Sequence, residues 1–306
     1  MRILLTGASS FTGSWLAAEL ARRGHTVVGT LQDSSAAYAP LARQRLEMCR
    51  VAGVTLANGV TYGSDALLGL VDEGWDAIAY HGADVRNYRG PDFDLLGALE
   101  RNTRGAAELC HRAVAAGVGR IIVSGTVFEP GSAAGDELDR AVTPYGLSKA
   151  LSWQVMRFHA REAGLAAGKF VIANPFGRFE QERYCTYLAR TWLAGETALV
   201  RMPDYVRDNV PISLMALGFA DFVEHPERPF AAPSGYVGTQ GVFTARFANE
   251  IGTRLGIATP FTLARQTDFS EPLVRTATEA MPGDWDEAEF WDDLARYYNQ
   301  LGPPEG

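Results

Sequence analysis

The chain has 306 residues, of which 47% are hydrophobic and 21% charged, proportions typical of a globular protein with a sizeable core. Its formal net charge is −8 and its basic residues are scattered, which argues against nucleic-acid binding because that requires a basic footprint. No apolar run reaches ~18 residues and no signal peptide is apparent, so we expect a cytoplasmic protein with no membrane partner.

Strands and helices alternate over the first 173 residues. The predicted strands span 2–6, 25–31, 55–57, 76–80, 120–124 and 169–173. The predicted helices span 14–23, 41–52, 65–71, one or two segments within 93–116, and 145–163. This alternation predicts right-handed crossovers and therefore an α/β fold with a Rossmann-type, doubly wound parallel sheet.

The alternation breaks after about residue 174, where short apolar pieces are separated by Pro and Gly and helices are expected only at 243–255 and 284–300. We therefore expect a sheet domain over 1–173, to which 205–225 returns. Residues 174–204 and 226–306 would form a smaller C-terminal lobe packed on it.

Cysteine and histidine are sparse. Cys49, Cys110 and Cys185 lie far apart, and the five histidines form no ligand spacing with them. We expect reduced thiols and no metal site. Cys185 is interpreted as a buried, inert thiol, with a role as proton donor left as the alternative.

The segment TGASSFTG, residues 6–13, follows the first strand. In a doubly wound sheet this turn holds the pyrophosphate of a dinucleotide on backbone N–H groups. Gly7 permits the tight turn and Gly13 lets the helix pack closely, whereas Ser10 stands where a third glycine is usual. A turn without a ligand is the alternative. The loop predicts NAD(P) binding by Gly7, Ser9, Ser10, Phe11, Thr12 and Gly13.

The segment PYGLSK places Tyr145 and Lys149 four residues apart, hence on one helix face, and Ser124 ends a predicted strand. An ammonium favours the phenolate and lowers a phenol pKa of ~10, while a serine hydroxyl can hold a carbonyl in line. We predict that Tyr145 is a general acid, Lys149 its electrostatic support, Ser124 the carbonyl anchor and Thr126 a second donor. A surface pair on an ordinary helix is the alternative for Tyr145 and Lys149.

With these motifs the sequence resembles the extended short-chain dehydrogenase/reductase family, in particular its nucleotide-sugar epimerases, dehydratases and reductases, whose pattern combines TGxxGxxG, a strand-end Ser or Thr, and YxxxK. The resemblance implies a nucleotide-diphosphate sugar as substrate, bound by the smaller lobe. It implies a homodimer through helices near 103–116 and 145–163. Further cofactor-site residues implied are His81, Gly82, Ala83 and Asn102, the last as a brace for the active-site helix. Substrate-site residues implied are Thr126, Asn174, Arg183, Arg207 and Arg275.

The end of the second strand departs from the family pattern. Leu31 stands where a carboxylate would bind the adenosine ribose of NAD, and no arginine for the extra phosphate of NADP follows before Arg43. Gln32 and Asp33 are the nearest polar candidates for the ribose. We favour NADP slightly over NAD, because the strand-end carboxylate is missing.

The acid pair that family dehydratases carry after the catalytic Ser or Thr is also absent, since Gly125 and Thr126 follow Ser124 and Glu129 lies too far along the chain. We therefore predict an NAD(P)-dependent 4-ketoreductase of a nucleotide-linked keto-deoxysugar. A 4-epimerase with retained NAD is the alternative. A non-catalytic regulator that senses NAD(P) is the alternative of another class.

Overall fold

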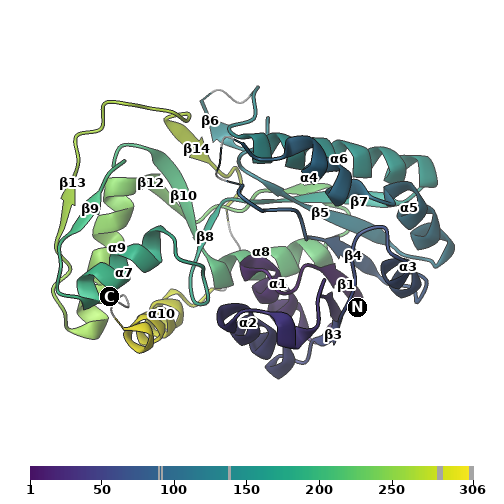
Figure 1. Ribbon diagram of the computed structural model, residues 1–306, viewed down its shortest axis with the longest axis horizontal. Helices are drawn as coiled ribbons and strands as arrows, with labels where there is room; N and C mark the ends of the chain where they lie inside the picture. Colours follow the sequence, from purple (N-terminus) through teal and green to yellow (C-terminus); the bar gives the residue numbers. More distant parts are fainter. Residues whose placement is uncertain (89, 91, 137–138, 281–284, 303–306) are drawn as a thin grey trace.

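The structure is a computed structural model that describes residues 1–88, 90, 92–136, 139–280 and 285–302. Its main sheet has seven strands: β1 (Arg2–Thr6), β2 (Thr26–Thr30), β3 (Thr55–Ala57), β4 (Ala77–Tyr80), β5 (Arg120–Thr126), β7 (Ala166–Ile172) and β11 (Phe230–Ala231). All neighbours are parallel, in the order β11-β7-β5-β4-β1-β2-β3 (Figure 1). This order confirms the predicted Rossmann-type, doubly wound sheet.

Helices cover both faces of the sheet (Figure 1). One face carries α3 (Asp65–Val71), α4 (Leu95–Thr103), α5 (Ala106–Ala115) and α6 (Pro144–Ala163). The other carries α1 (Phe11–Arg22), α2 (Pro40–Val51) and α8 (Ile212–Glu224), and a 3-10 turn at Ser35–Ala37 precedes α2. Each layer has its own apolar core, which explains why β4 and β5 are buried along their whole length. Gly105, at φ +71°, divides the segment predicted as one or two helices into α4 and α5.

The strand order places a switch point between β1 and β4. From β1 the chain proceeds to β2 and β3 on one side, then crosses to β4 and β5 on the other. In such sheets the crevice beyond the carboxyl ends of the strands at this point receives ligands. The loop after β1, the segment after β4 and the end of β5 therefore lie at the same edge of the sheet, beside this switch point.

The smaller lobe has a mixed sheet of β12 (Tyr236–Thr239), β10 (Val206–Pro211), β14 (Val274–Thr276) and β6 (Ala134–Gly135), with β8 (Asn174–Phe176) paired to β10. A two-stranded sheet joins β9 (Ala198–Val200) to β13 (Phe261–Leu263). Three helices, α7 (Tyr184–Leu193), α9 (Gln240–Leu255) and α10 (Glu287–Leu301), enclose a core rich in aromatic side chains. Phe176, Phe247 and Trp291 lie at its centre, with rings in mutual contact.

Two short strands pair across the expected domain boundaries. Strand β11 pairs with β7 at the edge of the main sheet, although 226–306 was assigned wholly to the smaller lobe. Strand β6 pairs with β14 in the lobe, although 1–173 was assigned to the sheet domain. Two-residue strands carry no hydrophobic periodicity, so only their pairing partners reveal them.

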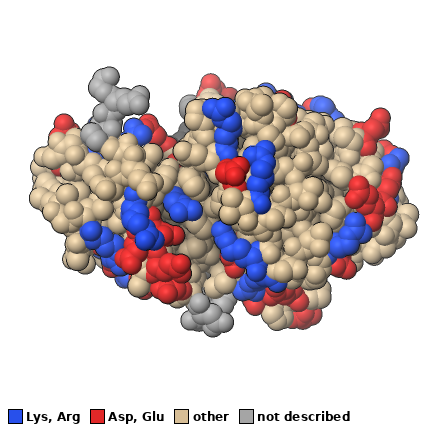
Figure 2. Space-filling model, turned by 90° about the horizontal axis from the view of Figure 1, so that it is seen from below, with Lys and Arg blue, Asp and Glu red and all other residues tan. Residues whose placement is uncertain are grey.

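The surface mixes both signs of charge. On the face shown in Figure 2, basic and acidic side chains are interspersed among uncharged residues rather than gathered into a basic stripe. Within the described part of the chain, no helix combines the length and apolar character needed to cross a bilayer. Among the same residues, no group of His, Cys, Asp and Glu side chains is arranged to hold a metal ion.

Candidate active site

The glycine loop joins the carboxyl end of β1 to the start of α1. Gly7 has φ +79°, and a Cβ on Gly13 would lie 2.3 Å from the Gly7 carbonyl oxygen, so the backbone itself requires both glycines. The Ser10 hydroxyl accepts a hydrogen bond from Gly13 N at 3.0 Å and so caps α1. Backbone N–H groups at a helix start of this kind suit the pyrophosphate of a dinucleotide.

His81 connects this loop to the end of β5. Its ring is buried, with Nε2 2.9 Å from Thr12 Oγ1 and 3.2 Å from Ser10 Oγ. Its Nδ1 lies 2.8 Å from Ser124 Oγ. Burial and the charge of Lys149 lower the pKa of His81 to about 3, so the imidazole is neutral and offers one donor and one acceptor.

The segment after β4 is fixed by Thr6, which the sequence analysis did not single out. Thr6 Oγ1 accepts hydrogen bonds from His81 N at 2.9 Å and from Gly82 N at 3.1 Å. Tyr62 bridges Thr6 Oγ1 and the Gly82 carbonyl. The threonine that opens TGASSFTG therefore holds the predicted cofactor segment, including the half-buried Ala83, against β1. The position of Thr6 at the end of the first strand was the feature of the sequence that could have indicated this role.

Tyr145 and Lys149 lie in the first turns of α6, which begins with Pro144 and is capped by Thr143. Edge contacts at 5.4 Å and 5.9 Å join the Tyr145 ring to Tyr88 and Phe93. Lys149 is buried, and burial lowers its pKa to about 8.

The pKa of Tyr145 corrects one expectation. We expected Lys149 to lower it, but burial raises it well above its ordinary value, with Glu129 and Tyr88 acting in the same direction and Arg183 opposing them. The phenol is therefore neutral at ordinary pH. A neutral phenol is suited to donate a proton.

Asn102 lies between two parts of the site. Its Oδ1 accepts a hydrogen bond from Asp84 N at 2.7 Å, and its Nδ2 donates to Ser152 Oγ of α6 at 3.5 Å. The side chain is buried. This geometry joins the segment after β4 to the active-site helix, as a brace would.

Two buried arginines lie side by side in the smaller lobe, and Nη1 of Arg207 donates to the carbonyl oxygens of Val206, Pro272 and Leu273. Arg207 of β10 and Arg275 of β14 are register partners, and both are buried. Glu271 Oε2 accepts from Nη2 of each, at 3.0 Å and 2.8 Å. Nε and Nη1 of Arg275 are buried without a hydrogen-bond partner among the described residues, and its guanidinium lies 3.9 Å from the Phe128 ring centroid. One carboxylate thus serves two guanidinium groups, which leaves positive charge near the end of β5.

The remaining predicted residues are more dispersed. Thr126 is buried at the end of β5, and the Arg183 guanidinium lies 5.9 Å from the ring centroid of Tyr88, which contacts Tyr145. Asn174 Nδ2 donates to the Asp208 carbonyl at 3.2 Å, between β8 and β10. Cys185 is buried in the aromatic core of the lobe, and burial raises its pKa well above the ordinary value.

The ribose end of the site is open. Gln32 and Asp33 are exposed just beyond β2, whereas Leu31 is 1% exposed and belongs to the apolar core. Leu31 therefore offers no polar group to a ligand at the end of β2. The two polar side chains that follow it are the ones in reach of solvent and of a ligand there.

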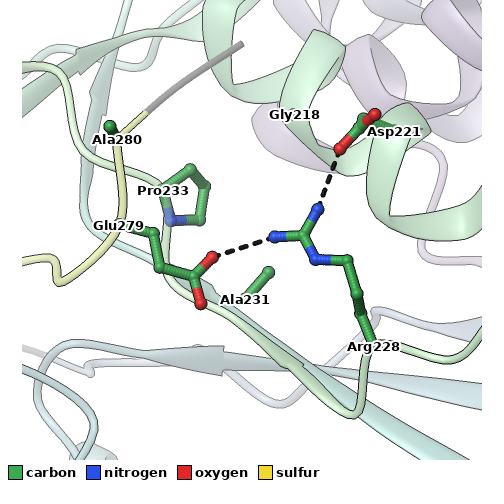
Figure 3. A pocket seen from close by; sticks show the side chains of 7 residues that line it. All are labelled: Gly218, Asp221, Arg228, Ala231, Pro233, Glu279 and Ala280. Carbon is green, nitrogen blue, oxygen red and sulfur yellow. Dashed lines mark hydrogen bonds and ion pairs between the residues drawn. The ribbon is translucent and has the colours of Figure 1, made fainter. Parts of the chain in front are cut away.

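A separate pocket of about 240 Å³ lies beside α8 and the edge strand β11 (Figure 3). Arg228 crosses it, donating to Asp221 at 2.8 Å and to Glu279 at 3.0 Å. Its described lining residues include none of the predicted catalytic or cofactor residues. The two carboxylates outnumber the arginine, so the charge of the pocket is unsuited to an anionic ligand.

Comparison with known proteins gives a family and a fold. Residues 3–228 match the family model described as the NAD dependent epimerase/dehydratase family. No curated protein sequence matches significantly.

UDP-glucuronic acid 4-epimerase from Bacillus cereus, solved with UDP-glucuronic acid and NAD, is similar at 17% identity and TM-score 0.72, over 98% of this chain and 100% of that one. UDP-N-acetylglucosamine 4-epimerase from Bacillus cereus is similar at 15% identity and TM-score 0.73, over 100% and 99%. UDP-glucose-4-epimerase from Stenotrophomonas maltophila, solved with NAD and formylated UDP-arabinopyranose, is similar at 18% identity and TM-score 0.72, over 98% of each chain.

Proposed function

This chain belongs to the NAD-dependent epimerase/dehydratase family of extended short-chain dehydrogenase/reductase enzymes, and from that membership we propose that it exchanges a hydride at C4 of a nucleotide-linked sugar. One observation carries the proposal. The buried ring of His81 contacts the glycine loop and Ser124, and the charge of Lys149 lowers its pKa. The predicted cofactor cradle therefore lies next to Ser124 and Lys149, two of the predicted catalytic groups.

The chain's own residues supply binding and proton transfer. The Ser124 hydroxyl, held by His81, would hydrogen-bond the sugar oxygen at C4 and orient it. Tyr145, as a neutral phenol, would donate its proton to that oxygen while the carbon gains hydride, and would take the proton back in the reverse direction. The Lys149 ammonium would stabilise the phenolate left behind. When bound in the glycine cradle, the nicotinamide ring supplies or accepts the hydride.

The substrate is proposed to be a nucleotide-diphosphate sugar. Arg207 and Arg275 present buried guanidinium groups, and their forked donors suit the oxygens of a diphosphate. Glu271 is 33% exposed and holds both arginines through one oxygen, so a diphosphate would compete with it for them. The UDP-sugars bound by two of the similar epimerases support this substrate class.

We favour a 4-epimerase, because the similar structures are of 4-epimerases and the site supplies what that reaction needs. A 4-ketoreductase is the second candidate, favoured by the raised pKa of Tyr145, which suits one-way proton donation.

For the cofactor we propose NAD, with Asp33 beside the adenosine ribose, in place of the slight preference for NADP. The family and the NAD found in the similar structures support this choice.

One experiment separates these functions. The purified protein is incubated with UDP-glucose, UDP-glucuronic acid or a UDP-4-keto-6-deoxysugar, with NAD or NADH, and both sugar and cofactor are followed. Conversion of one sugar to its C4 epimer without net cofactor change supports the epimerase. Stoichiometric NADH loss with the 4-keto sugar supports the ketoreductase. Tight cofactor binding with no turnover of any sugar nucleotide would contradict both and favour the regulator.

A further inference from the structure

The chain contains two lysines, Lys149 and Lys169, and arginine supplies the rest of its 28 basic residues. Both lysines are buried, each 6% exposed. An ammonium responds to burial and to neighbouring charges with a large change of pKa, which a guanidinium resists. The two lysines are therefore buried cations whose pKa values depend strongly on the groups around them.

Lys169 points toward the active-site helix. On β7 it is the register partner of Val123 on β5, whose side chain belongs to the core beneath α6. Register partners in a parallel sheet face the same side. Its Nζ lies 2.6 Å from Glu129 Oε2 and donates to Ser132 Oγ at 2.8 Å. Trp153 of α6 lies over it, with 6.0 Å between Nζ and the ring centroid.

Glu129 is folded back against the end of β5. Its side chain is 0% exposed, and Oε1 accepts a hydrogen bond from Thr126 N at 2.7 Å. A Cβ on Gly125 would lie 2.6 Å from Lys169 Cε and 2.9 Å from Glu129 Oε1. The Glu129–Lys169 pair thus fills the space of a side chain at position 125, directly after Ser124. The position of Glu129 in the sequence did not predict this approach to Gly125.

Lys149 lies on α6 one helical turn from Tyr145 and one turn from Trp153, the residue that lies over Lys169. Three titratable groups on other segments interact with the Lys149 charge: His81 after β4, Glu129 after β5 and Lys169 on β7. Glu129 is the carboxylate of this set, and it favours the charged form of Lys149, whereas burial and Lys169 oppose it. A buried carboxylate with two buried ammonium groups leaves a net charge of about +1 on the cluster at neutral pH.

We propose that Glu129, fixed in place by Lys169, is a positioning residue that keeps the Lys149 ammonium charged beside Tyr145. This inference rests on the proposed function for the role of Lys149 in proton transfer. Without the Glu129 charge, two ammonium groups would face each other in the interior, and Lys149 would lose its proton at lower pH.

The two-lysine composition makes a direct test possible without turnover. The full chain is labelled with [13C]lysine, the two side-chain signals are assigned with Lys169→Met, and each is titrated in wild type and in Glu129→Gln. In wild type the Lys149 midpoint is expected near pH 8. In Glu129→Gln it is expected to fall by about one pH unit or more. Glu224→Gln, which removes a surface carboxylate paired with Arg23, is the control and leaves both midpoints unchanged.

A measurement on the wild type covers the case in which Glu129→Gln does not fold. Since both lysines interact with Glu129, the side-chain signal of Lys169 is expected to shift at the pH where Lys149 titrates. An unchanged Lys149 midpoint in Glu129→Gln would overturn the inference. So would a Lys169 signal in the wild type that ignores the titration of Lys149.

The pH profile of turnover gives a second readout that a structural role alone would not move. In Glu129→Gln the alkaline limb of kcat is expected to shift to lower pH while KM for the sugar nucleotide is unchanged. Lack of turnover in the wild type would contradict the proposed function, and the lysine titration would still decide the inference.

Discussion

The Nδ1 atom of His81 lies 2.8 Å from the hydroxyl oxygen of Ser124, and the opposite edge of the same ring contacts Thr12 of the glycine loop. A single neutral imidazole therefore joins the cofactor cradle to the carbonyl anchor. Loss of its hydrogen bonds would leave the buried Ser124 hydroxyl without this partner, at a cost of about 1–3 kcal/mol.

His81→Phe is expected to reduce the pH dependence of the free energy of unfolding between pH 4 and 7. The folded-state pKa of about 3 lies below the ordinary 6.5, so the unfolded chain binds more protons between these values. Stability from this group is therefore complete above about pH 6.5 and is lost as pH falls toward 3, by at most about 1.4 kcal/mol per pH unit. Urea unfolding between pH 4 and 7 measures the slope, and the exposed His111→Phe serves as control. Equal slopes in wild type and His81→Phe would refute the assignment.

Tyr145→Phe is expected to reduce turnover by about 10²–10⁴-fold, because the sugar oxygen loses its proton donor. NAD affinity, measured by fluorescence titration, is expected to stay within a factor of a few. The edge contacts with Tyr88 and Phe93 involve the ring and survive the change. Near-normal turnover would exclude the Tyr145 phenol from the mechanism.

The arginine pair and Glu271 predict opposite effects on substrate affinity. Arg207→Met removes a donor for the diphosphate, and the Kd for UDP is expected to rise about 10–100-fold, which is about 1.4–2.8 kcal/mol. Glu271→Gln weakens the internal competitor, so UDP is expected to bind more tightly. Isothermal titration with UDP measures both, with Arg228→Gln at the separate pocket as control. A Glu271→Gln protein that binds UDP more weakly than wild type would show that Glu271 supports the site instead of competing for it.

Asp33 is expected to set the cofactor preference. Its carboxylate is exposed just beyond β2, where it would accept a hydrogen bond from the ribose of NAD and repel the phosphate of NADP. Asp33→Ser is expected to reduce the preference for NAD over NADP by about tenfold in Kd, which is about 1.4 kcal/mol. Fluorescence titration with each cofactor measures this ratio, and Asp65→Ser on α3 is the control. If the ratio does not change, Asp33 has no contact with the ribose.

The apolar surface of the helical layer predicts a homodimer. Leu147, Leu151 and Phe158 of α6 are 37%, 36% and 54% exposed, and Leu96 of α4 and Val114 of α5 are 74% and 41% exposed. Burial of these side chains against a second copy would remove them from water at about 25 cal/mol per Å². Light scattering is expected to give a dimer for wild type and a monomer for Phe158→Glu. Val51→Glu on α2, at an equally apolar exposed position, should leave the dimer intact.

Hydrophobic periodicity was enough to predict most elements of the main sheet and its helices. The helix from 65 to 71 and the strand from 55 to 57 match the structure in their bounds. The glycine loop and the Tyr145–Lys149 spacing likewise depend on local geometry, and they led to the correct family. Short strands such as β6 and β11 escaped prediction, since two residues contain no period.

What the sequence determined by itself was the set of local elements and the motifs built on neighbouring residues, because helix spacing and tight turns act over a few residues. Tertiary structure decided which distant groups share a buried space. Glu129 forms an ion pair with Lys169, which lies on β7, 40 residues further along the chain. Glu271 forms an ion pair with Arg207, and no spacing rule connects their two segments. Burial then sets the pKa of Tyr145, Lys149 and His81, since the cost of removing a charge from water depends on the surrounding atoms and not on the chain neighbours.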